Sequence, residues 1–139
     1  MRGGWHLTGA AGLLALAGYA ASAANGTTAP ELAEGKVVYD KWCTPCHGDA
    51  PRLAGTLALQ TKYEGKIPAA LELRTDLTPE TVGYFVRNGV AWMAPFRKTE
   101  ISDAELAAIG AYLSAPLEER GLSAEALAKA RAAQGGAGQ

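Results

Sequence analysis

The chain has few of the side chains that bind metals or carry out redox chemistry. Its 139 residues include two cysteines, two histidines and two methionines. Both cysteines and one histidine fall within residues 43–47, and the sequence holds no second cluster of these residue types. A structural zinc site takes four protein ligands. The count therefore argues against zinc.

An excess of charge of one sign is also missing. The chain has 13 lysine and arginine residues against 14 aspartate and glutamate residues, which gives a net charge of -1. Binding to nucleic acid needs a clustered basic face, and an anionic membrane surface attracts polybasic segments. The sequence therefore predicts neither nucleic acid nor an anionic membrane as a partner.

Long apolar runs are absent as well. The stretch over residues 7–21 falls short of the roughly 20 apolar residues that span a bilayer. Arg2 precedes it, and residues 21–23 (Ala-Ser-Ala) give the small-residue pattern that a signal peptidase cleaves. We therefore predict a signal peptide over residues 1–23, cleaved near Ala23, and a periplasmic protein without stable membrane insertion. An uncleaved membrane anchor is the alternative.

The apolar periodicity predicts helices, and no segment shows the alternation typical of a strand. One helix begins at Glu31 and runs into Cys43. A second begins after Thr78, a good N-cap that is followed by proline. A third begins at the capping box that Ser102 and Glu105 form. The fold class expected from these signals is all-α.

The remaining segments have weaker patterns. Residues 24–30 are predicted to be a flexible lead-in, residues 31–116 the folded domain, and residues 117–139 a tail that is weakly helical or disordered. Residues 48–76 are rich in glycine and proline, and we expect mostly loop with one or two short helical turns. A loop of this length inside a compact domain needs something to organise it, and a bound cofactor would do so.

The most specific motif is Cys43-Thr44-Pro45-Cys46-His47, and three interpretations of it compete. In a c-type haem site both thiols bond to the haem vinyl groups and the adjacent imidazole becomes the proximal iron ligand. A thiol–disulfide active site would need a neighbouring βαβ pattern, which is not visible. A zinc site lacks a fourth ligand. The context favours one covalently bound haem c, attached through Cys43 and Cys46 and ligated by His47.

Met93 is the predicted second axial ligand of that haem. It lies between two predicted helices, in a loop with Pro95 and Phe96, and it is the only methionine once Met1 leaves with the signal peptide. A methionine that merely fills a gap in the core is the ordinary alternative. A thioether ligand raises the reduction potential and suits an electron carrier. A haem enzyme or sensor with an open distal site is the competing hypothesis.

These features together resemble a class I cytochrome c. The likeness rests on the Gly35 and Tyr39 helix before the motif, the segment from Met93 to Phe96, and a last helix with Ala111-Tyr112-Leu113. It implies a small fold of three to five helices around one haem, with the first and last helices crossing near Gly35. It also implies an electron carrier rather than an enzyme, with redox proteins as partners.

A narrower likeness is to the cytochrome subunits of p-cresol methylhydroxylase-type flavocytochromes. It rests on residues 39–41 (Tyr-Asp-Lys) and residues 86–89 (Val-Arg-Asn-Gly). It implies that the protein takes single electrons from a flavin-dependent dehydrogenase, one that acts on phenolic substrates, and passes them to a downstream acceptor. Another periplasmic dehydrogenase is the alternative donor. We expect the contact surface to be an apolar rim formed by Pro45, Ala50, Trp92 and Ala94.

Overall fold

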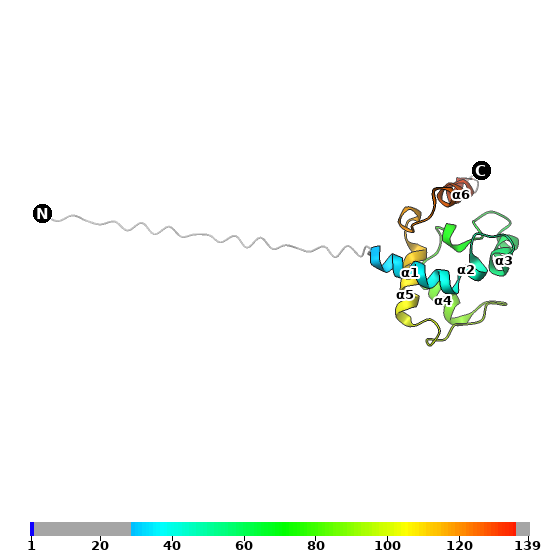
Figure 1. The fold of residues 1–139 in the computed structure, drawn as a ribbon, viewed down its shortest axis with the longest axis horizontal. Coiled ribbons are helices and arrows are strands. Elements are labelled where there is room, and N and C mark those ends of the chain that lie inside the picture. Colours follow the sequence, from blue (N-terminus) through cyan, green and yellow to red (C-terminus); the bar gives the residue numbers. More distant parts are fainter. Residues whose placement is uncertain (2–28, 136–139) are drawn as a thin grey trace.

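The computed structural model describes Met1 and residues 29–135, and residues 29–135 form a helical domain (Figure 1). Within them lie six α-helices and two 3₁₀ helices, and no strand. The elements are α1 (Ala29–Trp42), α2 (Thr44–His47), α3 (Ala54–Tyr63), η1 (Leu71–Leu73), α4 (Pro79–Asn88), α5 (Asp103–Ser114), η2 (Leu117–Glu119) and α6 (Ala124–Gly135). The all-α prediction is confirmed, with more helices than the three to five expected.

Two points bear on the predicted export. The signal peptide from Arg2 onward, its cleavage site and most of the lead-in lie outside the described residues. Within residues 29–135, no helix is both long enough and apolar enough to cross a bilayer.

Helices α1 and α5 form the centre of the domain and meet at Gly35. An added Cβ on Gly35 would lie 2.2 Å from the backbone oxygen of Ala108 and 2.7 Å from Cβ of Tyr112. One turn further along α1, the rings of Tyr39 and Tyr112 lie 5.7 Å apart between centroids. The predicted crossing of the two helices near Gly35 is therefore confirmed.

The starts of α4 and α5 match the sequence signals. The Thr78 side chain accepts a hydrogen bond from the backbone N–H of Thr81 at 3.2 Å, with Pro79 at the first helical position. At α5, the Glu105 carboxylate accepts from the N–H of Ser102 at 2.7 Å, and the Ser102 hydroxyl accepts from the N–H of Glu105 at 3.2 Å. Both predicted caps are confirmed.

The segment over residues 48–76 is more regular than predicted, because it contains the ten residues of α3 as well as η1. Only Thr56 of α3 is buried, so the helix has no apolar stripe that periodicity could detect. The hydroxyl of Thr56 donates to the backbone oxygen of Gly48 at 2.7 Å. A polar contact to the segment just after the motif thus fixes the helix.

The segment after Pro116 packs against η1. Ala130 of α6 is fully buried in a cluster with Leu73 and Leu117. Arg120 is 3 % exposed, and its guanidinium donates to the backbone oxygens of Glu72, Arg74 and Ala115 at 2.8–2.9 Å. Residues 117–132 therefore hold the segment 70–74 in place.

Candidate haem site

The two thiols lie in one helical turn directly after α1. The N–H of Cys43 donates to the backbone oxygen of Tyr39 at 2.8 Å, and the N–H of His47 donates to the oxygen of Cys43 at 2.8 Å. Residues three apart in such a turn lie on the same side. Neither Cys43 nor Cys46 is in a disulfide. Both sulfur atoms are therefore free, on one side of the turn.

The thiols differ in their surroundings. Cys46 is exposed, whereas Cys43 is partly buried against the main apolar core. Burial, together with the nearby Cys46, raises the pKa of the Cys43 thiol to about 12. Thiol–disulfide active sites depend instead on a lowered pKa that yields a thiolate. The environment of Cys43 is therefore unlike that of a redox-active thiol.

The imidazole of His47 lies directly against the backbone of α3. An added Cβ on Gly55 would lie 2.5 Å from Nδ1 and 2.4 Å from Cε1 of His47. Nδ1 is buried without a hydrogen-bond partner, and burial lowers the pKa of His47. Burial thus favours the neutral form of the ring, which is the form that binds metals.

This arrangement fits a covalently attached haem. An imidazole that binds iron through Nε2 keeps its proton on Nδ1, and Nδ1 is the nitrogen that the protein encloses. Two free thiols, Cys43 and Cys46, precede it in the sequence. The chemistry of the donor set and the orientation of the ring therefore both suit the cofactor.

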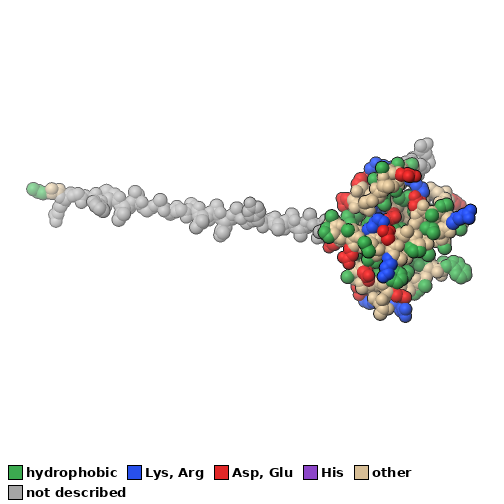
Figure 2. Space-filling model, viewed as in Figure 1, with side chains coloured by type: hydrophobic (Ala, Val, Ile, Leu, Met, Phe, Trp, Pro, Cys, Tyr) green, Lys and Arg blue, Asp and Glu red, His purple; other side chains and the backbone are tan. Residues whose placement is uncertain are grey.

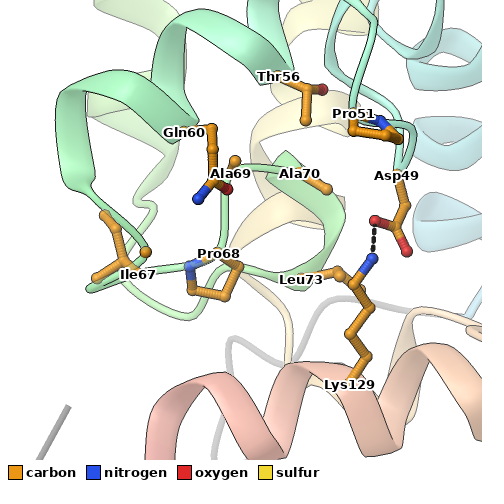
Figure 3. A pocket seen from close by; sticks show the side chains of 11 residues that line it. Asp49, Pro51, Thr56, Gln60, Ile67, Pro68, Ala69, Ala70, Leu73 and Lys129 are labelled. Atoms are coloured by element: carbon orange, nitrogen blue, oxygen red, sulfur yellow. Dashed lines mark hydrogen bonds and ion pairs between the residues drawn. The ribbon is translucent and has the colours of Figure 1, made fainter. Parts of the chain in front are cut away.

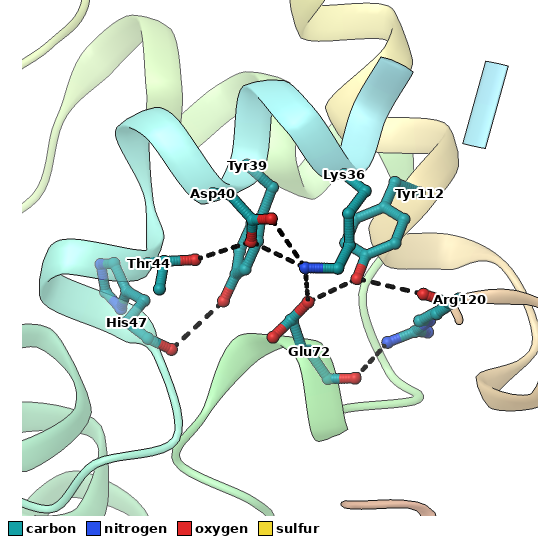
Figure 4. Close-up of polar contacts among 8 residues, drawn as sticks. All are labelled: Lys36, Tyr39, Asp40, Thr44, His47, Glu72, Tyr112 and Arg120. Carbon is teal, nitrogen blue, oxygen red and sulfur yellow. Dashed lines mark hydrogen bonds and ion pairs between the residues drawn. The ribbon is translucent and has the colours of Figure 1, made fainter. Parts of the chain in front are cut away.

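A network of polar side chains from α1, η1 and α5 lies next to the motif (Figure 4). The hydroxyl of Tyr39 donates to the backbone oxygen of His47 at 3.3 Å. Tyr112 donates to the carboxylate of Glu72, which also pairs with Lys36 at 3.5 Å. The network joins α1, η1 and α5 beneath the motif. Sequence reasoning missed Glu72, because nothing in the local pattern marks it.

Thr56 and Gly55 are two further residues that the sequence did not single out. Besides its bond to Gly48, the Thr56 hydroxyl lies 3.4 Å from the backbone oxygen of Cys46. Gly55 allows the His47 ring to approach α3. Glycine and threonine at the start of a helix are common, so neither position carried a specific signal.

Met93 lies in a tight turn within the Met93 loop, which we define as residues 89–96. Val90 and Met93 exchange two backbone hydrogen bonds of 2.9 Å. Gly89 has φ +70°, and an added Cβ there would lie 2.5 Å from the backbone oxygen of Met93. Ala91 also has a positive φ of 50°. The turn fixes the backbone of Met93, whose side chain is partly buried against the main core.

A direct contact joins the Met93 loop to the motif. The rings of Trp42 and Phe96 meet edge to face with centroids 5.7 Å apart. Trp42 immediately precedes Cys43, and Phe96 follows Met93 by three residues. Cys43 and Met93 pack against the same apolar core. Segments that are some 50 residues apart in the chain therefore meet at one place.

A separate small cavity lies between α3, residues 65–73 and α6 (Figure 3). Its volume is about 200 Å³, below the roughly 300 Å³ at which small-molecule pockets begin. Lys129 and Asp49 form an ion pair beside it. None of the four predicted site residues lines this cavity. It is therefore separate from the predicted site residues.

Comparisons with known proteins agree with these features. A family model described as "Cytochrome C oxidase, cbb3-type, subunit III" matches residues 30–113, a range that includes the motif and the Met93 loop. No curated protein and no solved structure matches the chain. The likeness to p-cresol methylhydroxylase-type flavocytochromes finds no support in these comparisons.

The family match identifies the cofactor and the general role. It covers well over half of the chain, and the sequence contains one Cys-x-x-Cys-His motif. The cofactor is therefore covalently bound haem c, and the role is electron transfer. The chain belongs to the c-type cytochrome family described as cytochrome c oxidase, cbb3-type, subunit III.

Proposed function

We propose that this protein is an exported, periplasmic electron carrier with one His/Met-ligated haem. Cys43 and Cys46 attach the haem, His47 is the proximal ligand and Met93 is the distal ligand. The observation that carries the proposal is the contact between Trp42 and Phe96, which brings the loop of Met93 to the motif. The packing of Cys43 and Met93 against the same apolar core supports the same arrangement.

Each of these residues has a distinct task in the proposed site. The haem supplies the one-electron chemistry when bound. His47 presents a neutral imidazole whose Nδ1 edge is fixed against α3. With haem bound, Met93 would be the second iron ligand and would leave no open site for oxygen or peroxide. A haem without an open position transfers electrons and does not transform a substrate.

Ligation by Met93 can be tested by ligand binding. We expect the reduced wild-type protein to resist carbon monoxide, whereas Met93→Ala binds it readily and loses the ferric band that is typical of a thioether ligand. Val90→Ala is a matched control, because Val90 lies in the same turn with an exposed side chain. Ready binding by the wild type would refute the proposal and support a haem enzyme or sensor.

We further propose that partners dock on the apolar rim formed by Pro45, Ala50, Trp92 and Ala94. All four residues are exposed, and Trp92 is fully so. Figure 2 shows acidic and basic side chains mixed over the visible face, consistent with the net charge of -1. A small exposed rim of this kind suits short-lived contacts that bury less than about 1,200 Å².

The proposed donor is a flavin-dependent dehydrogenase that acts on phenolic substrates. The likeness of residues 39–41 and 86–89 to flavocytochrome subunits supports it. The name of the matching family points instead to an oxidase of the cbb3 type. Purification from the native host distinguishes the two. A co-migrating flavoprotein that reduces the haem supports the first partner, and a co-migrating oxidase supports the second.

A further inference from the structure

Arg87, in the last turn of α4, bonds to two other segments at once. One guanidinium nitrogen donates to the backbone oxygen of Phe96 at 3.1 Å, and the other donates to the carboxylate of Asp103 at 3.0 Å. The side chain is 22 % exposed. A single residue therefore ties α4 to the end of the Met93 loop and to the first turn of α5.

The Met93 loop has few apolar contacts of its own. Ala91, Trp92, Ala94 and Pro95 are all exposed, and only Met93 and Phe96 reach the core. Segments with few buried contacts open at a small free-energy cost. The contacts at the two ends of the loop therefore have a large influence on how often it opens.

The two ends of the loop are held differently. At the entry, Gly89 and the paired backbones of Val90 and Met93 form a compact turn. At the exit, Phe96 has three supports. These are the bond from its N–H to the oxygen of Val86 at 2.8 Å, the contact of its ring with Trp42, and the bond from Arg87. Arg87 is the only charged support among them.

Asp103 holds the guanidinium in place. It is the first residue of α5, where a carboxylate also interacts favourably with the helix dipole. Lys98 pairs with the same carboxylate at 2.6 Å. Arg87 thus reaches from an exposed carboxylate, which it shares with Lys98, to the loop backbone. A charge-assisted hydrogen bond to a partly buried carbonyl is stronger than a neutral one.

We propose that Arg87 is a positioning residue that keeps the Met93 loop closed and so keeps the Met93 thioether on the haem iron. This inference rests on the proposed ligation by Met93. Without Arg87, the Phe96 carbonyl loses its donor and the loop opens more often. Losing one such bond raises the open fraction about tenfold or more. An added ligand that binds only the open form then gains the same factor in apparent affinity.

Imidazole titration of the ferric holoprotein measures this factor. For Arg87→Met, which keeps the apolar stem, we expect the apparent Kd for imidazole to fall about tenfold and the thioether band to weaken at low imidazole. The apparent Kd of Arg87→Lys for imidazole should lie between those of Arg87→Met and the wild type, because one ammonium group cannot bridge both acceptors in the same way. Arg97→Met is the matched control. Arg97 is exposed and pairs with Glu100, and its variant should stay within about twofold of the wild type.

A second variant covers the case in which Arg87→Met fails to fold. Asp103→Asn keeps Arg87 and the loop residues and removes the negative charge that pairs with Arg87 and with Lys98, so we expect a smaller fall in the Kd for imidazole. An unchanged Kd in the folded Arg87 variant, or in Asp103→Asn if Arg87→Met does not fold, overturns the role of Arg87.

The same titration separates this inference from the ligation on which it rests. A wild-type protein without the thioether band, or one whose band survives Met93→Ala, refutes ligation by Met93 and the role of Arg87 with it. A wild-type protein with a Met93-dependent band, but with an Arg87→Met variant that binds imidazole as the wild type does, refutes the role of Arg87 alone.

Discussion

Gly35 is where α1 and α5 approach most closely, and replacing it by alanine tests how tightly the domain is built. The new Cβ would lie 2.2 Å from the backbone oxygen of Ala108 and 2.8 Å from the carbonyl carbon of the same residue. These are backbone atoms of a helix, so no flexible side chain can move aside. Helix α1 must shift away from α5 and loosen the contact of Tyr39 with Tyr112.

The magnitude follows from two opposing effects. Overpacking a tight contact costs about 1–3 kcal/mol, and a clash with backbone belongs at the upper end of that range. Alanine in place of glycine inside a helix returns about 1 kcal/mol. We therefore expect Gly35→Ala to lower the free energy of unfolding by about 2 kcal/mol.

The assay is urea unfolding of the holoprotein followed by far-ultraviolet circular dichroism. Gly83→Ala is the matched control, because it makes the same change inside α4 and an added Cβ meets nothing within 4 Å. That variant should gain up to about 1 kcal/mol from helix propensity alone. If both variants shift stability equally, Gly35 is not a point of close contact and the packing argument fails.

Three further outcomes are expected from residues around the site. Gly55→Ala pushes a methyl group into the His47 ring, and we expect less haem per protein and an altered visible spectrum. Arg120→Met leaves three backbone oxygens without their donor, so urea unfolding should show a loss of about 1–3 kcal/mol, and an unchanged midpoint would contradict the role of Arg120. A hydrogen bond from Arg74 lowers the pKa of Asp76 in the folded protein. A carboxylate with a lowered pKa stabilises the fold at pH values above its unfolded-state pKa, which is near 3.9. This stabilisation is lost as the pH falls through the folded-state pKa. The wild type should therefore exceed Asp76→Asn in stability at neutral pH, with the difference vanishing in acid; a difference that is constant with pH would refute the pairing.

Local signals in the sequence predicted much of the fold. The caps at Thr78 and Ser102 each depend on residues at most three positions apart, and the structure contains both. Gly35 and Tyr39 predicted the helix crossing, because a glycine and an aromatic residue one turn apart form a packing surface. Features of this kind can be read from one short segment.

Long-range polar contacts could not be predicted in the same way. Helix α3 went undetected because its buried residue is Thr56, which is fixed by hydrogen bonds rather than by an apolar face. Arg120 bonds to backbone atoms 46 and 48 residues earlier. A backbone carbonyl is present at every position, so the sequence does not indicate which one a buried arginine will reach.

The two proposed axial ligands are anchored to different parts of the domain. His47 depends on α1, α3 and the network around Glu72, whereas Met93 depends on α4, α5 and Arg87. The first set includes the two proposed covalent attachments and a buried ring edge, and the second includes hydrogen bonds, one aromatic contact and the packing of Met93 and Phe96 against the core. A perturbation should therefore detach Met93 from the haem iron before it detaches His47. Under mild denaturation we expect the thioether band in the visible spectrum to disappear while the far-ultraviolet circular dichroism of the helices persists. Simultaneous loss of both signals would show that the Met93 loop does not open separately from the rest of the domain.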